Sequence, residues 1–162
     1  AQSKFSKDFN SKNWDDKIPS QDYFKELFRV SKNWIIWGGN YFPLPPSRGV
    51  IVWDKMNFLP SMSRIEIAWN SKDMLPKLIQ INNTDRNRIH LTQKPIALYK
   101  WLLSTYCKMG DKILDTHLGS GSIAIACYDK GFDLTACEIF EDYYLLALER
   151  FEKHKSESPS LF

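Results

Sequence analysis

The last third of the chain alternates between short apolar runs and longer runs with helical periodicity. Residues 112–115 and 134–138 are typical of buried strands, and residues 122–130 and 141–153 are typical of amphipathic helices. A strand–helix–strand–helix order needs crossover connections, so the two strands should lie parallel and be joined by a right-handed crossover. The pattern therefore predicts an α/β fold.

The first two thirds of the chain hold weaker signals. Pro19-Ser20 marks the start of a helix with Ser20 as its N-cap, and a second helix begins near Pro95 and ends at Gly110. Strands are expected at three apolar or alternating stretches and, more weakly, at a fourth: residues 34–37, 50–54, 65–69 and 78–81.

Length and composition restrict the class of protein. With 162 residues the chain is long enough to bury one substantial core. Its longest apolar runs, such as residues 49–53, are too short to span a bilayer, and we expect neither a leader peptide nor a membrane partner. The three cysteines are odd in number and widely spaced, which favours free thiols in a reducing cytosol. Cysteines and histidines show no metal-ligand spacing, so no metal site is expected.

The strongest local signal for a ligand is the stretch from Ile113 to Ala124, where a buried strand runs into a turn with Gly119 and Gly121 and then into a helix. Glycines let the backbone approach a ligand closely, and ligands of open α/β sheets bind at the carboxyl ends of the strands. Glu138 falls at the end of the next strand, where a carboxylate can accept hydrogen bonds from both hydroxyls of a ribose. The turn is therefore a candidate cofactor site.

The glycines alone leave three interpretations open. A tight turn without a ligand, the G-x-G-x-x-A dinucleotide fingerprint that residues 119–124 satisfy, and a site for a cationic cofactor all fit them. Asp115 favours the third, because an anionic side chain repels a pyrophosphate and attracts the sulfonium and ammonium groups of S-adenosylmethionine.

A second element, His90-Leu91-Thr92-Gln93-Lys94-Pro95, lies about twenty residues before Asp115 and in isolation has the features of a helix start. The two motifs in this order and spacing resemble DNA amino-methyltransferases of the circularly permuted beta class, which place an H-x-T-Q-K-P element directly upstream of a D-P-F-x-G-S-G-T cofactor loop. The resemblance covers roughly residues 14–153. It implies a Rossmann-like class I methyltransferase fold with a mostly parallel, doubly wound sheet.

The resemblance also implies roles for individual residues toward S-adenosylmethionine. The glycine turn would surround the methionine part and comprises Asp115, Thr116, His117, Leu118, Gly119, Ser120 and Gly121. Glu138 would bind the ribose, and Ile139 would contact the adenine. Thr92, Lys94 and Pro95 would close over the methionine end. Thr116 and His117 replace the family's Pro and Phe, which makes this wall of the pocket more polar.

The family's catalytic tetrapeptide, D/N/S-P-P-Y/F/W, does not occur in the sequence. Leu44-Pro45-Pro46-Ser47 lacks both its polar first residue and its aromatic last residue. The resemblance places the tetrapeptide upstream of Ala1, so no catalytic residue is assigned, and we expect no methyl transfer by residues 1–162 alone. Two explanations for the missing tetrapeptide stay open: the chain is a fragment or the resolved part of a longer protein, or the chain has lost catalysis.

The expected function is the transfer of a methyl group from S-adenosylmethionine to the exocyclic N6 of adenine in duplex DNA, with the base taken out of the stack. Methylation of cytosine N4 stays open, because the missing tetrapeptide would distinguish the two bases. Two further functions compete with these: a nicotinamide-dependent oxidoreductase, and a remnant that binds DNA or cofactor without turnover.

Charge and aromatic side chains indicate where DNA would bind. The net charge is +3, but residues 72–112 hold eight Lys and Arg against three Asp, whereas residues 113–162 hold four basic against nine acidic side chains. A basic middle and an acidic end favour a polyanion on one side of the molecule. Five residues are expected to contact bases or phosphates: Trp37, Tyr41, Phe42, Arg86 and Arg88.

The expected organisation is a single methyltransferase domain of residues 1–162. Within it, residues 1–13 form a mobile loop, residues 72–91 a small DNA-contacting insert and residues 154–162 a flexible tail.

The last residues, Ser160-Leu161-Phe162, are similar to the end of the Q-L-S-L-F peptide with which bacterial replication proteins bind the sliding clamp, although Ser158 and Pro159 stand where Gln and Leu would be. The sliding clamp is therefore an expected partner beside double-stranded DNA. Packing of Leu161 and Phe162 onto the protein's own surface is the alternative. We also expect a homodimer, and a location in the cytosol of a bacterial or phage-infected cell.

Overall fold

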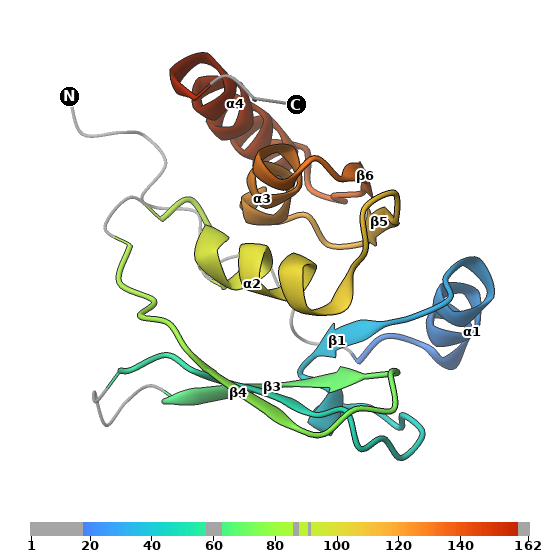
Figure 1. The fold of residues 1–162 in the computed structure, drawn as a ribbon. Coiled ribbons are helices and arrows are strands. Elements are labelled where there is room, and N and C mark those ends of the chain that lie inside the picture. Colours follow the sequence, from blue (N-terminus) through green and yellow to red (C-terminus); the bar gives the residue numbers. More distant parts are fainter. Residues whose placement is uncertain (1–17, 58–62, 86–87, 91, 159–162) are drawn as a thin grey trace. The chain divides into compact units, whose positions relative to one another are not determined.

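The computed structural model describes residues 18–57, 63–85, 88–90 and 92–158. Within these residues the chain forms two compact units (Figure 1). The first comprises residues 18–54 and 63–79, and the second comprises residues 55–57 together with the described residues from 80 onward. The single domain expected from the sequence stays a prediction.

The first unit begins with helix α1 (Gln21–Val30), whose start agrees with the sequence. The Ser20 hydroxyl accepts a hydrogen bond from the Tyr23 N–H at 3.3 Å, which is the N-cap that Pro19-Ser20 predicted. The apolar face of α1 carries Phe24 and Phe28. Phe28 packs edge-on against Trp34, with 4.8 Å between the ring centroids, so aromatic rings join the helix to the neighbouring sheet.

The sheet of the first unit has four strands in the order β1-β3-β2-β4 (Figure 1). Its elements are strands β1 (Ile35–Trp37), β2 (Ile51–Asp54), β3 (Ile65–Asn70) and β4 (Lys77–Gln80), with the short 3-10 helix η2 (Gly39–Tyr41) after β1. All four strands were predicted, including the weak one. Strand β2 is the most buried, because the Ile51 and Trp53 side chains are fully enclosed.

The pairings around β3 differ from the mostly parallel sheet that the sequence led us to expect. Strand β3 is antiparallel to both β1 and β2, with Trp37 opposite Ala68 and Val52 opposite Ile67. Strands β2 and β3 are joined by residues 55–64, which is shorter than a crossover through a helix requires. Neighbouring strands with so short a connection pair antiparallel.

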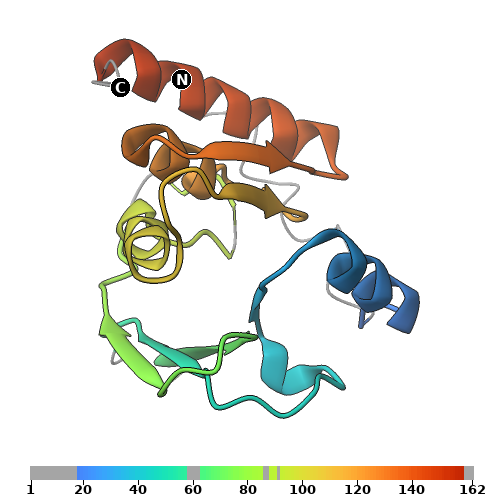
Figure 2. The same ribbon diagram turned by 45° about the vertical axis from the view of Figure 1, so that its right-hand side comes forward.

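The second unit contains the predicted parallel strand–helix repeat. Strands β5 (Lys112–Asp115) and β6 (Asp133–Ala136) are parallel, with Asp115 opposite Ala136. Helices α2 (Ile96–Tyr106), α3 (Ser122–Lys130) and α4 (Glu141–Glu157) accompany them, and α3 packs against both other helices (Figure 1, Figure 2). The α/β class and a parallel pair of strands are thus confirmed.

The core of the second unit lies between α2, α3 and the strand pair. Leu103, Ala126 and Cys127 are buried at its centre, and Ile113 and Leu134 reach it from the two strands. Deep burial raises the pKa of the Cys127 thiol to about 12, so the group stays protonated and inert.

The carboxylate of Asp129 on α3 contacts both other helices of the second unit. Asp129 on α3 accepts from Lys100 of α2 at 2.6 Å and lies 2.7 Å from the His154 ring of α4. Burial acts to raise the pKa of Asp129, but the two hydrogen-bonded partners outweigh it and hold the pKa below its usual value. Helix α4 continues to Glu157, so residues 154–157, which were expected in a flexible tail, are helical.

Among the described residues, no helix combines the length and apolar character needed to cross a membrane, and no three His, Cys, Asp or Glu side chains gather as metal ligands would. Residues 1–13 and Ser160-Leu161-Phe162, on which a mobile loop and a clamp-binding tail were predicted, lie outside the described residues.

Candidate cofactor site

The glycine turn between β5 and α3 continues the strand pairing and then folds back. Beyond the last paired residues, the Cys137 N–H donates to the Asp115 carbonyl and the Leu118 N–H donates to the Cys137 carbonyl, both at 2.9 Å. The Gly121 N–H then donates to the Leu118 carbonyl at 3.0 Å and closes the turn. Gly119 and Gly121 have φ values of 53° and 71°, the left-handed region in which a side chain is strained.

Glu138 lies on the same rim as the turn and binds it. One carboxylate oxygen accepts from the Gly119 N–H at 2.8 Å and the other from the Phe140 N–H at 3.1 Å. A carboxylate offers about four acceptor positions, so roughly two remain for a ligand. Asp115 ends β5 and Glu138 follows the end of the neighbouring parallel strand β6, so both carboxylates lie at the carboxyl ends of adjacent strands, as the sequence predicted.

Asp115 is the second carboxylate of the rim. It accepts a hydrogen bond from the His117 N–H at 2.9 Å. Burial raises the pKa of the Asp115 carboxyl, and the negative charge of Glu138 raises it further, whereas the His117 N–H and the charge of Lys94 act in the opposite direction. Two carboxylates facing one turn favour a ligand that carries positive charge.

We expect Asp115→Asn to raise the melting temperature of the ligand-free chain near neutral pH. Because burial raises the pKa of Asp115, the proton stabilises the native state below the pKa of the unfolded chain, and this contribution is lost as the pH rises through the native pKa. Asparagine keeps the acceptor for the His117 N–H without the buried charge. Thermal unfolding should show a larger gain near pH 7 than near about pH 4; a variant less stable than the unmodified chain near pH 7 would contradict this account.

The His90–Pro95 element lies against the turn. A Cβ added to Gly119 would come 3.7 Å from the His90 ring, and this ring lies 4.4 Å, centroid to centroid, from that of Tyr143 on α4. The Thr92 N–H donates to His90 Nδ1 at 3.2 Å. Burial lowers the pKa of His90, and its effect exceeds the opposing pull of Glu138, so the neutral imidazole is favoured.

Side chains of the same element alternate in environment. Thr92 is exposed and Lys94 half-buried, whereas Gln93 between them is 4% exposed. Gln93 accepts from the Ile89 N–H at 3.1 Å and donates to Asp85 at 2.8 Å. The element is therefore fixed from one side through Gln93 and Asp85.

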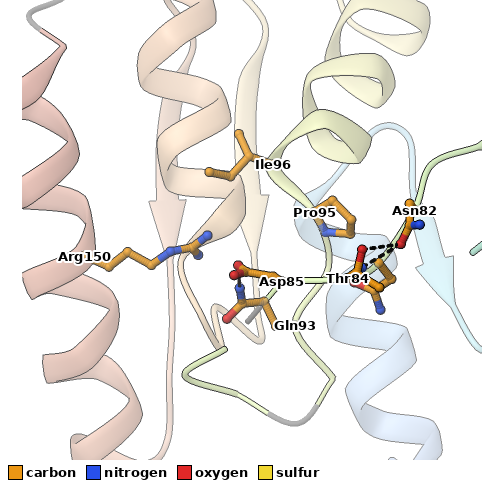
Figure 3. Close-up of a pocket in the computed structure, with 8 residues that line it drawn as sticks. Asn82, Thr84, Asp85, Gln93, Pro95, Ile96 and Arg150 are labelled. Carbon is orange, nitrogen blue, oxygen red and sulfur yellow. Dashed lines mark hydrogen bonds between the residues drawn. The ribbon is translucent and has the colours of Figure 1, made fainter. Parts of the chain in front are cut away.

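A pocket of about 160 Å³ opens beside Gln93 (Figure 3). Asp85 and Arg150 bring opposite charges to its wall. The remaining lining comes from the loop before the His90–Pro95 element, from that element and from the first residue of α2: Asn82, Asn83 and Thr84; Gln93 and Pro95; and Ile96. Of the predicted site residues that the structure describes, only Pro95 lines this pocket.

The remaining predicted residues differ in their surroundings. Ser120 is buried, Leu118 is half-buried, the Thr116 hydroxyl lies 3.0 Å from His117 Nδ1, and Ile139 is 89% exposed. An exposed apolar side chain beside Glu138 suits the contact with an adenine that was predicted for Ile139.

The residues predicted to contact DNA are divided between the units. Trp37, Tyr41 and Phe42 belong to the first unit. Tyr41 is 73% exposed, whereas Trp37 packs edge-on against Trp53 and Phe42 packs against Phe24. Of these three rings, that of Tyr41 is the most exposed.

Of the two predicted arginines, Arg86 lies outside the described residues. Arg88 donates to the carbonyl of Asn83 at 3.1 Å and, more weakly, to that of Gln93 at 3.5 Å, so its guanidinium binds backbone next to the pocket.

Sequence reasoning assigned no role to Arg150, Asp85 or Gln93. Arg150 of α4 donates to the Ser120 carbonyl at 2.8 Å and to the Ser122 hydroxyl at 2.9 Å. The available signal was the position of Arg150 three residues after Ala147, on the helix face that is buried.

A parallel strand–helix–strand unit with a glycine turn after the first strand and a carboxylate after the second defines a cofactor site of the Rossmann type at the strands' carboxyl ends. Comparisons with known proteins narrow this class. A sequence profile described as DNA methylase, for N6 and N4 methyltransferases, matches residues 52–149, more than half of the chain. A search of curated proteins found no match.

Among solved structures, the chain is similar to M1.HpyAVI in complex with S-adenosylmethionine, with 25% identity and a TM-score of 0.53 over 64% of this chain and 61% of that one. A second M1.HpyAVI structure gives 19% identity and a TM-score of 0.50 over 80% of this chain and 66% of that one. The chain thus spans less than two thirds of the protein it matches. Its fold is that of the class I methyltransferases, and the chain belongs to the DNA methylase family.

Proposed function

We propose that the chain is the cofactor-binding part of an S-adenosylmethionine-dependent DNA methyltransferase that acts on the exocyclic N6 of adenine in duplex DNA. The observation that carries the proposal is the rim formed by Asp115, Glu138 and the glycine turn. It offers two carboxylates to a cofactor that carries a sulfonium and an ammonium group. A dinucleotide, whose pyrophosphate is anionic, fits this rim poorly.

The residues present fit the cofactor. Glu138 has acceptor positions left for the two ribose hydroxyls after binding Gly119 and Phe140. Ile139 offers an exposed apolar surface to the adenine, and Asp115 would hold the cationic end. Bound S-adenosylmethionine would supply the methyl group in electrophilic form.

Several predicted residues would act on the cofactor's methionine end. Thr92 and Lys94 flank the buried Gln93, and the charge of Lys94 reaches both Asp115 and His90. A cation at this place suits the methionine carboxylate. The neutral His90 beside Gly119 adds no charge that would oppose the sulfonium.

For the substrate, the family match supports a DNA amino group, and the exposed Tyr41 provides a ring on which a base taken out of the stack could lie. Methylation of cytosine N4 is the second candidate, because the matching profile covers N6 and N4 methyltransferases alike.

Calorimetry on the 162-residue chain tests the cofactor. We expect S-adenosylmethionine and S-adenosylhomocysteine to bind, NAD to bind more weakly, and Asp115→Ala to lower the affinity for S-adenosylmethionine, since it removes a carboxylate that faces the cation. Asp111→Ala, which removes an exposed carboxylate ahead of β5, is the matched control. Equal or tighter binding of NAD would refute the methyl-donor proposal.

Identifying the target base requires a methylation assay on the protein as its gene encodes it. Incubation with duplex DNA and labelled cofactor, followed by nucleoside analysis, should give N6-methyladenine. Recovery of N4-methylcytosine would establish the second candidate. Cofactor binding without any methyl transfer would favour a non-catalytic role.

A further inference from the structure

Helix α4 contacts the glycine turn at two positions one helical turn apart. Ala147 is buried beneath Gly121, so that a Cβ added to Gly121 would lie 3.1 Å from the Ala147 Cβ. Arg150 projects from the same face of α4, because residues three apart on a helix are neighbours. The turn thus rests on a small side chain and a guanidinium of one helix.

The guanidinium binds on both sides of Gly121. Nη1 of Arg150 donates to the Ser120 carbonyl at 2.8 Å and to the Ser122 hydroxyl at 2.9 Å. Ser120 and Ser122 are 5% and 2% exposed, so water does not readily replace these bonds. A buried carbonyl that loses its donor destabilises the conformation that buries it.

The Ser120 carbonyl also determines the direction of the next N–H. Because the peptide bond is planar and trans, fixing this carbonyl toward Arg150 turns the Gly121 N–H the opposite way. The Gly121 N–H donates to the Leu118 carbonyl at 3.0 Å, and the Leu118 N–H donates to Cys137 at 2.9 Å. Gly119, inside this closed turn, donates to Glu138. A chain of hydrogen bonds and peptide bonds therefore connects Arg150 to the carboxylate of Glu138.

Electrostatics indicates that Arg150 is present for its donors and not for its charge. A cation at the amino-terminal end of α3 faces the positive end of the helix dipole, which is unfavourable. Burial lowers the pKa of Arg150, and the negative charge of Asp85 across the pocket opposes this effect (Figure 3). Gln93 in turn holds Asp85 by a 2.8 Å hydrogen bond, so the compensating charge is fixed to the His90–Pro95 element.

We infer that Arg150 is a positioning residue for the cofactor turn: it orients the Ser120–Gly121 peptide so that Gly119 and Glu138 are set for the cofactor. The inference rests on the proposed function for its ligand. The ordering of the turn is independent of any ligand.

Arg150→Met keeps an unbranched side chain and removes every donor. It should weaken binding of S-adenosylhomocysteine about tenfold, the equivalent of losing one hydrogen bond to a charged group. It should also speed hydrogen exchange of the amides of residues 118–121. Arg150→Lys, which keeps a cation and its donors, should recover part of both. Lys153→Ala, an exposed change one turn further along α4, is the matched control and should alter neither.

Chemical rescue separates positioning from simple loss of packing. In Arg150→Ala, which enlarges the adjacent pocket, millimolar guanidinium should restore affinity for S-adenosylhomocysteine, whereas sodium chloride at the same concentration should not. If Arg150→Met or Arg150→Ala fails to fold, Ser122→Ala removes one of the two acceptors and should weaken binding about threefold.

The outcomes are distinguishable. In the first case, the unmodified chain binds S-adenosylhomocysteine while the Arg150 and Ser122 variants keep the same affinity and the same hydrogen exchange at residues 118–121. This result overturns the inference and leaves the proposed function intact. Failure of the unmodified chain to bind either S-adenosylmethionine or S-adenosylhomocysteine overturns the proposed function and the cofactor part of the inference. Faster exchange of residues 118–121 in Arg150→Met would then still support the ordering of the turn.

Discussion

Gly121→Ala should destabilise the native chain by about 3 kcal/mol, whereas Gly119→Ala should cost only about 1 kcal/mol. Both glycines have positive φ, and a non-glycine residue there costs about 1–2 kcal/mol. At Gly121 the added Cβ would also lie 3.1 Å from the Ala147 Cβ and 3.3 Å from its carbonyl oxygen, and overpacking of this kind costs about 1–3 kcal/mol. At Gly119 the nearest atoms are 3.7 Å away, which is an ordinary contact.

Urea unfolding followed by circular dichroism would measure the two free energies of unfolding, with Gly119→Ala as the matched control for the backbone strain. Gly121→Ala combined with Ala147→Gly should recover part of the loss, because the contact disappears while the strain at φ stays. Equal losses for the two glycine variants would contradict the role assigned to Ala147.

Glu138→Ala should weaken binding of S-adenosylhomocysteine by about a hundredfold or more. The carboxylate would accept from two ribose hydroxyls, and each hydrogen bond to a charged group contributes about 1.5–3 kcal/mol. The variant also removes the acceptor that holds the Gly119 N–H at 2.8 Å, so the turn loses an anchor together with the ligand contact. Both losses act on the same ligand, which is why this effect should exceed that of any other single change proposed for the rim.

Calorimetry with Glu138→Ala should be paired with Glu141→Ala, which removes an exposed carboxylate at the start of α4. Glu138→Gln should fall between the two, because its amide keeps one acceptor oxygen but turns an NH2 group toward a backbone N–H. If Glu138→Ala bound S-adenosylhomocysteine within about threefold of the unmodified chain, Glu138 would not be the ribose ligand.

The sequence predicted those parts of the fold that depend on local periodicity. The strand at residues 112–115 and the helix at residues 122–130 were predicted with their observed limits, because a glycine turn separates a period of two from a period of 3.6. Ser20 was identified as an N-cap since the capping hydrogen bond joins residues only three positions apart. Helix α4 extended beyond its predicted end at Lys153, where no glycine or proline stops it before Pro159.

What the sequence did not predict depends on contacts between distant residues. Arg150 and Ser120 are thirty positions apart, and no periodicity records their hydrogen bond. The partnership of Gln93 with Asp85 depends on the path of the loop between them. The antiparallel pairing of β3 with both β1 and β2 was not predicted, because the resemblance implies a mostly parallel sheet, whereas the connection between β2 and β3 is too short for a crossover.

The order in which the chain visits its two units has a consequence for how such proteins can be recombined. The first unit is built from two separate stretches, whereas all secondary structure of the second comes from one continuous stretch after residue 80. The rim carboxylates, the glycine turn, the His90–Pro95 element and the residues that support them therefore form one uninterrupted cassette from Asp85 to Arg150. A single genetic crossover near residue 80 would therefore transfer the whole of this cassette to a different partner sequence.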